Sequence, residues 1–147
     1  MGASMEKKTS RLTVKASPEH LAEVQDFIDR FLEEYGCSMK TQMLIDVTVE
    51  EIFVNIASYA YPEEPGDAQI EVSSDMTGSG KNCIRITFSD WGIPFDPLGH
   101  EDPDLSLPVE KRSIGGLGIY MVKKNMDQVS YEHLDDQNKF TICKILN

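Results

Sequence analysis

The stretch VEEIFVNIASYAYP, Val49–Pro62, is predicted to form one helix that carries two polar residues in an apolar context. At 100° per residue, one face of this helix is apolar and is expected to pack against a sheet. That face comprises Ile45, Val49, Ile52, Phe53, Ile56 and Ala60. Glu51 and Asn55 lie one turn apart on nearly the opposite side, whereas Asp46 and Glu50 fit a solvated face better. A carboxylate and an amide so placed either form a helical i, i+4 contact or face a polar ligand.

The length and charge of the chain limit the classes of protein to consider. Its 147 residues suit a single domain over 1–147, in which 1–10 are expected to be flexible. No apolar run approaches the ~20 residues of a membrane span, and the first residues lack the apolar part of a signal peptide, so we expect a cytoplasmic protein. The net charge of −11 disfavours nucleic-acid binding, and a phosphate ligand must be held by local groups.

Hydrophobic periodicity and turn residues predict the remaining elements. They are a strand at 11–16, a helix at 17–36 capped by Ser17, a helix at 39–61, strands at 68–76 and 83–90, a helix from 114, and strands at 128–134 and 139–145 around a DDQN turn. The segment 91–113 has four prolines and no period, which is typical of a lid over a ligand. This order predicts an α+β fold, a two-layer sandwich in which helices cover one face of a mixed, mostly antiparallel sheet.

Two further segments carry residues that suit a nucleotide. Asp90 ends a strand and Gly92 follows it, so the carboxylate either accepts from an amino group such as that of adenine or belongs to a tight turn. Gly115, Gly116 and Gly118 surround a helix start, where free backbone amides can bind phosphate. The alternatives for these glycines are a flexible hinge or tight packing of the helix against the sheet. No GK[ST] follows them and no βαβ unit surrounds them, which excludes a Walker loop and a Rossmann fingerprint.

Taken in order, E-x-x-x-N on a helix, D-x-G at a strand end, a lid and G-x-G opening a helix resemble the GHKL, or Bergerat-fold, ATPase superfamily. Within it, the stretch GGLGIYMVKKNMDQVSYE resembles the anti-sigma factor serine kinases of the RsbW and SpoIIAB type. The resemblance covers about Leu12–Ile145. It departs from the family at Ile56 and Tyr59, because the asparagine is often followed by alanine and Tyr59 stands where histidine is common.

The resemblance implies a role for each matching residue. Asn55 would coordinate Mg²⁺, and Glu51 would be the general base that accepts the proton of a substrate serine. The implied nucleotide contacts are Asp90 and Gly92 at adenine, Gly115, Gly116 and Gly118 at the phosphates, and Arg112 at the γ-phosphate. Arg112 is otherwise a solvated charge of the lid.

The implied activity is that of an ATP- and Mg²⁺-dependent protein serine kinase in a partner-switching circuit. It would bind a sigma factor and phosphorylate a STAS-domain anti-anti-sigma protein, with a homodimer possible and no direct contact to nucleic acid or membrane. One alternative is a nucleotide-binding module that sequesters a partner without catalysis, although Glu51 favours the kinase. A second is the ATPase domain of a histidine kinase, but no two-helix dimerisation unit surrounds His20.

Overall fold

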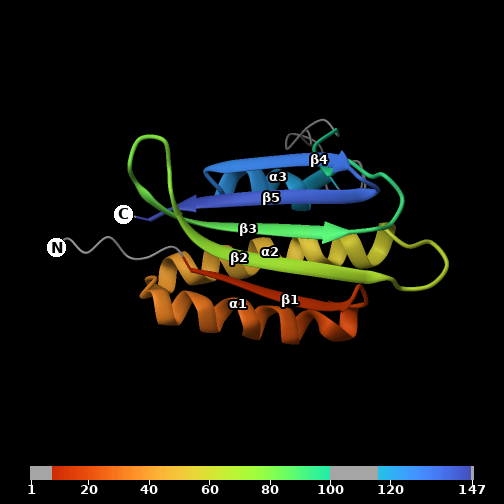
Figure 1. The fold of residues 1–147 in the computed structure, drawn as a ribbon, viewed down its shortest axis with the longest axis horizontal. Coiled ribbons are helices and arrows are strands. Elements are labelled where there is room, and N and C mark those ends of the chain that lie inside the picture. Colours follow the sequence, from red (N-terminus) through yellow and green to blue (C-terminus); the bar gives the residue numbers. More distant parts are fainter. Residues whose placement is uncertain (1–7, 100–115, 147) are drawn as a thin grey trace.

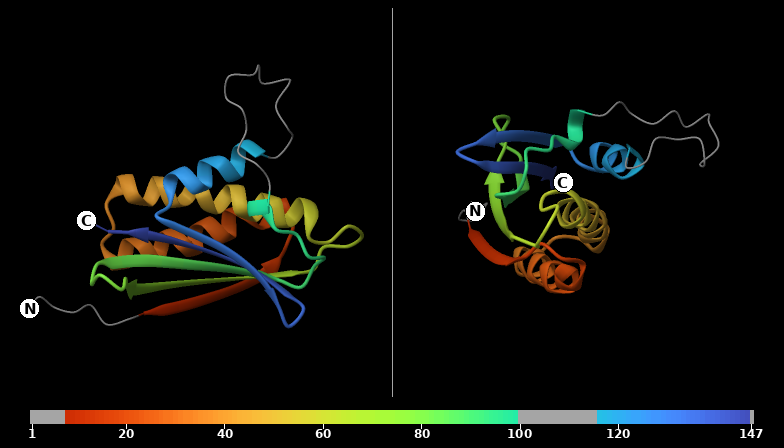
Figure 2. Two further views of the ribbon diagram at one scale, coloured as in Figure 1. Left: turned by 90° about the horizontal axis from the view of Figure 1, so that it is seen from above. Right: turned by 90° about the vertical axis from the view of Figure 1, so that its right-hand side faces the viewer.

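A computed structural model of the chain describes residues 8–99 and 116–146. In this part of the chain, three α-helices lie on one face of a five-stranded sheet (Figures 1 and 2). The elements are β1 (Thr9–Lys15), α1 (Leu21–Tyr35), α2 (Met39–Tyr59), β2 (Asp67–Met76), β3 (Asn82–Asp90), α3 (Gly116–Asn125), β4 (Gln128–Leu134) and β5 (Gln137–Ile145), with short 3-10 helices at Pro18–His20 and Pro97–Gly99. The predicted α+β class, with helices on one face, is confirmed.

The strands are arranged in the order β1-β2-β3-β5-β4, and each of these neighbouring pairs is antiparallel. The sheet predicted to be mostly antiparallel is therefore antiparallel across all the described strands. The predicted first strand is an edge strand, and it begins at Thr9, before its predicted start. Phe88 pairs with Ile70 on one side and with Phe140 on the other, which forms an apolar row across the middle of the sheet.

The core lies between this sheet and the helices. All six residues assigned from the sequence to the apolar face of α2 are buried. Four apolar residues of α1 are buried with them: Val24, Ile28, Phe31 and Leu32. In the part of the chain that the structure covers, no helix combines the length and apolarity that crossing a membrane demands.

One helix start differs from the prediction. Ser17 makes no side-chain cap to the backbone; its hydroxyl donates instead to Glu19, and one turn of 3-10 helix precedes α1. The predicted cap at Ser17 is therefore wrong, although Gly36 ends α1 in the left-handed conformation, with φ of 88°. The helix predicted from 114 is described from Gly116 onward.

The turn between β4 and β5 is shorter than predicted. Asp135 and Asp136 have φ of 55° and 61°, as the two central residues of a tight hairpin turn require. Gln137 and Asn138, predicted to lie in the turn, are therefore the first residues of β5. As a result Asn138 pairs directly with Asp90 of β3.

A pair of carboxyl groups lies between α1 and α2. Asp46 was expected on a solvated face, but it is only partly exposed. The Oδ1 atoms of Asp46 and Asp29 are both buried without a hydrogen-bond donor. Burial, contact with Asp29 and the charge of Glu33 together raise the pKa of Asp46 to about 7, and burial contributes most. A proton on Asp46 thus joins the two side chains.

We predict that Asp46→Asn stabilises the protein at alkaline pH only. Between the unfolded pKa near 3.8 and the folded pKa of about 7, the folded state keeps a proton that the unfolded state releases, so the stability of the wild type falls as pH rises through this window. The substituted amide can donate to Asp29 at any pH. Urea unfolding should show the variant more stable by about 1–2 kcal/mol near pH 8 and nearly unchanged near pH 4.

The control for this prediction is Glu50→Gln, which removes an exposed carboxylate from the same helix. Its effect on the free energy of unfolding should not show the gain near pH 8 that is expected for Asp46→Asn. Equal effects of the two substitutions near pH 8 would show that general charge relief, and not the Asp29–Asp46 contact, is responsible.

Candidate functional site

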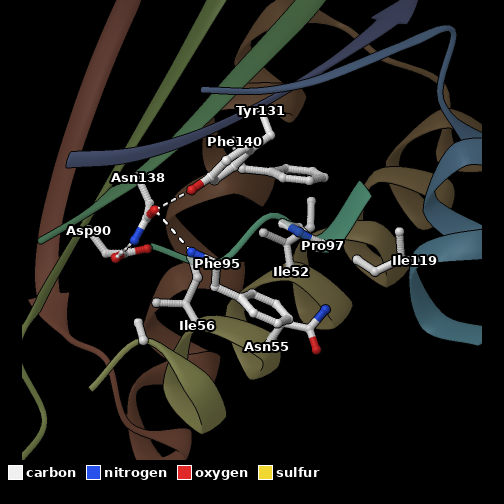
Figure 3. Close-up of a pocket in the computed structure, with 11 residues that line it drawn as sticks. Ile52, Asn55, Ile56, Asp90, Phe95, Pro97, Ile119, Tyr131, Asn138 and Phe140 are labelled. Carbon is white, nitrogen blue, oxygen red and sulfur yellow. Dashed lines mark hydrogen bonds between the residues drawn. The ribbon is translucent and has the colours of Figure 1, made fainter. Parts of the chain in front are cut away.

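A cavity of about 30 Å³ lies between α2 and the ends of the central strands (Figure 3). Five parts of the chain line it: α2, the end of β3, the segment that follows β3, the first turns of α3, and the β4–β5 hairpin. Ile52, Ile56, Ile119 and Phe140 supply apolar walls. Polar side chains stand at two places, with Asp90 at the sheet and Asn55 on α2 (Figure 3).

Asp90 is a buried carboxylate with one oxygen fixed by the protein. Only 4% of its surface is exposed. Its Oδ1 accepts hydrogen bonds from the backbone N–H of Gly92 at 3.0 Å and from Nδ2 of Asn138 at 2.8 Å. No described residue donates to Oδ2. A buried carboxylate with a vacant acceptor position favours a ligand that carries an amino group.

Asn138 connects this carboxylate to the beginning of the segment predicted as a lid. Its amide nitrogen also donates to the carbonyl of Ile93 at 2.8 Å. Its Oδ1 accepts from the hydroxyl of Tyr131 and from the backbone N–H of Phe95 at 3.4 Å (Figure 3). Burial raises the pKa of Tyr131, so the hydroxyl retains the proton that it donates. The buried side-chain amide of Asn138, on β5, therefore links β3, β4 and the segment that follows β3.

Gly92 allows the chain to pass close to the end of α2. A Cβ at this position would lie 2.1 Å from the carbonyl oxygen of Ala60. The next residue, Ile93, donates its N–H to the same carbonyl at 2.9 Å. The close approach that the structure shows at Gly92 is thus to the protein backbone, and its contact with a nucleotide stays a prediction.

Glu51 and Asn55 occupy consecutive turns of α2, both partly exposed. Asn55 lines the cavity, whereas Glu51 lies against the first turn of α3. A Cβ on Gly118 would lie 2.3 Å from Oε2 of Glu51, so a side chain at this position would displace the carboxylate from where it lies. The close packing at Gly118 is thus against the side chain of Glu51 on α2 and not against the sheet, and its contact with a phosphate stays a prediction.

The structure brings most of the predicted site residues to one end of the fold. Glu51 and Asn55 face α3 and the cavity, Asp90 ends the neighbouring strand, and Gly116 opens the helix that carries Gly118. Arg112 and Gly115 lie outside the described residues.

Sequence reasoning missed three residues of the site. Asn138 was assigned to a turn, Tyr131 to an ordinary strand position, and Phe95 to the lid without a role. Phe95 lines the cavity and stacks on Tyr59, with ring centroids 5.4 Å apart and planes 28° apart. Recognition of Asp135 and Asp136 as a two-residue turn would have placed Asn138 in the strand that follows. The pairing of β5 with β3, however, leaves no signal in the local sequence.

Comparison with known proteins identifies the family of the chain. Residues 14–144 match the family model of the histidine kinase-like ATPase domain. The chain is 30% identical over 91 residues to the serine-protein kinase RsbW of Bacillus cereus, and equally to that of Bacillus anthracis. These matches cover 59% of this chain and 54% of the relatives, so the chain spans about half the length of the curated relatives that it matches.

A solved structure has a similar fold. It contains the RsbU and RsbW domains of Rv1364c from Mycobacterium tuberculosis, and it superposes with a TM-score of 0.62 at 16% identity. The match covers 95% of this chain and 32% of that chain. Because the family model matches residues 14–144, nearly the whole chain, the chain belongs to the histidine kinase-like ATPase domain family.

Proposed function

We propose that this protein is an ATP-dependent serine kinase and anti-sigma factor, which phosphorylates a STAS-domain anti-anti-sigma protein and sequesters a sigma factor. The observation that carries the proposal is the placement of Asp90 at one part of the cavity and of Glu51 and Asn55 beside it on α2. The kinase name of the RsbW relatives supports the same activity.

The cavity suits the adenine base in chemistry. Its apolar walls can pack on the two faces of a purine, and Oδ2 of Asp90 can accept a hydrogen bond from the exocyclic amino group. Guanine presents a carbonyl oxygen at that position and would be repelled by the carboxylate. A volume of about 30 Å³ holds only one or two water molecules, so the segment with Phe95 and Pro97 must move outward to admit the base.

The protein oxygen beside the proposed phosphate position is of a kind that Mg²⁺ binds. The ion prefers hard oxygen ligands and usually takes one or two from the protein, the rest coming from phosphates and water. The amide oxygen of Asn55, at the cavity, is such a ligand. Bound there, Mg²⁺ would neutralise charge on the phosphate oxygens. The first turn of α3, from Gly116, would present backbone N–H groups to the same phosphates.

Glu51 is placed to act on the substrate serine. Its carboxylate lies one turn of α2 from Asn55 and against Gly118, so it is next to the proposed phosphate position without lining the base cavity. There Glu51 accepts the hydroxyl proton while the serine oxygen bonds to the γ-phosphorus and the bond to the leaving ADP oxygen breaks.

We predict that Glu51→Gln abolishes phosphate transfer and preserves nucleotide binding. The amide cannot accept the serine proton, but it has nearly the same shape, and Glu51 does not line the base cavity. Incubation with labelled ATP, Mg²⁺ and the cognate STAS protein should show transfer reduced about a hundredfold or more. ATP affinity can be followed through the single tryptophan, Trp91, which follows Asp90 directly.

The same variant separates the kinase from a module that only sequesters its partner. If the wild type binds ATP but transfers no phosphate to serine, and partner control in cells is unchanged by Glu51→Gln, the sequestering function is correct and the kinase proposal fails.

We predict that Gly118→Ala impairs transfer with little loss of stability. The new Cβ collides with Oε2 of Glu51, and a flexible carboxylate can swing away at small energetic cost. Alanine also favours a helix over glycine by up to about 1 kcal/mol, which offsets the collision. The transfer rate should fall at least about tenfold, while the melting temperature stays within a few degrees of the wild type.

Gly78→Ala serves as the control, since a Cβ there meets no atom within 4 Å. Unchanged transfer in Gly118→Ala would mean that the position of the Glu51 carboxylate does not matter for the reaction.

A further inference from the structure

A second polar feature lies at the opposite end of α2 from Asn55. A groove of about 470 Å³ runs between the first turn of α2, the β2–β3 turn and the end of β5. In Figure 1 these three parts of the chain lie together near the C-terminus. Three lysines line the groove: Lys40, Lys81 and Lys144. Such a cluster is unexpected in a chain with a net charge of −11.

Two of the three lysine charges are not neutralised by the described protein. Lys144 donates to the carbonyl of Asn125 and lies 3.8 Å from Asp127, which also lines the groove. Lys40 and Lys81 are exposed, and no ion pair joins either of them to another described residue. The groove therefore has an excess positive charge and attracts carboxylates.

An exposed apolar row runs beside the groove along α2. Met39, Met43 and Val47 follow one another at four-residue spacing, so they share one side of the helix. Their exposed fractions are 70%, 62% and 53%. Lys40 and Leu44, which line the groove, form the adjacent row. Methionine side chains are flexible and adapt to the shape of a partner, as at many protein-binding surfaces.

The two flanks of this apolar row carry opposite charge. Lys40 lies on the flank of the groove, while the exposed carboxylate of Glu50 lies on the flank toward α1. A small anion would use the lysines but would leave the apolar row uncovered. A partner segment with both apolar and acidic side chains would cover the row and pair with the lysines, and it could bind in one orientation only.

We propose that the lysine-lined groove and the Met39–Met43–Val47 row together dock an acidic segment of a partner protein that presents apolar side chains beside its carboxylates. The groove begins about 20 Å along α2 from Glu51, since thirteen residues separate Ser38 from Glu51 at 1.5 Å each. The lysine groove is therefore remote from the nucleotide site, whereas Val47, at the other end of the row, lies one turn of α2 from Glu51. The proposal requires neither nucleotide binding nor phosphate transfer.

The test is an NMR titration of the full, nucleotide-free chain with a synthetic helical peptide of leucine and glutamate. Amide resonances of residues near 38–47, Lys81 and Lys144 should shift, and binding should weaken as salt is raised. Lys40→Glu combined with Lys81→Glu should weaken binding about tenfold or more. The matched control, Lys139→Glu, changes one charge on the sheet face away from the helices and should leave binding unchanged.

Three results would overturn the proposal. In the first, a leucine–lysine peptide of the same length binds as well as the glutamate peptide. In the second, inorganic phosphate alone produces the same shifts, which would make the groove a small-anion site. In the third, the shifts appear on raising the protein concentration without peptide, which would assign the surface to a second copy of this chain. Because the titration contains no nucleotide, none of these results bears on the kinase proposal.

Discussion

The buried amide of Asn138 is the contact on which the geometry of the candidate site depends. It fixes Oδ1 of Asp90 and at the same time binds the backbone of Ile93 and Phe95, in the segment that follows β3. A buried amide left without these partners would cost a few kcal/mol, so the arrangement is held firmly. The binding surface for a base and the start of the predicted lid are therefore parts of one hydrogen-bonded unit, and movement of one affects the other.

Helix α2 serves both the core and the surface. Its apolar face packs on the sheet through residues such as Val49 and Phe53, which fixes the helix axis. The remaining positions are then free to carry Glu51 and Asn55 near one end and the Met39–Met43–Val47 row near the other. Because a helix is rigid over this length, the proposed catalytic carboxylate and the proposed docking surface are held at a constant separation.

Much of the fold could be predicted from local patterns. The apolar period of α2, the alternation in β2 and β3, and Gly36 at the end of α1 are all short-range signals, and each agrees with the structure. The role of Asn138 could not be predicted, because its contact with Asp90 joins residues 48 positions apart through strand pairing. The prediction of a solvated Asp46 failed for a similar reason. A helical wheel shows which residues share a side of α2, but it does not show where α1 packs and so could not reveal the contact with Asp29.

The most direct test of the account is a crystal structure with Mg²⁺ and a non-hydrolysable ATP analogue. The account predicts that the exocyclic amino group of adenine lies within hydrogen-bonding distance of Asp90 Oδ2, and that Asn55 Oδ1 lies about 2.1 Å from the ion. It also predicts that Phe95 has moved away from the cavity. A nucleotide bound elsewhere, with the cavity still closed by Phe95 and Oδ2 of Asp90 bonded to the protein, would contradict it.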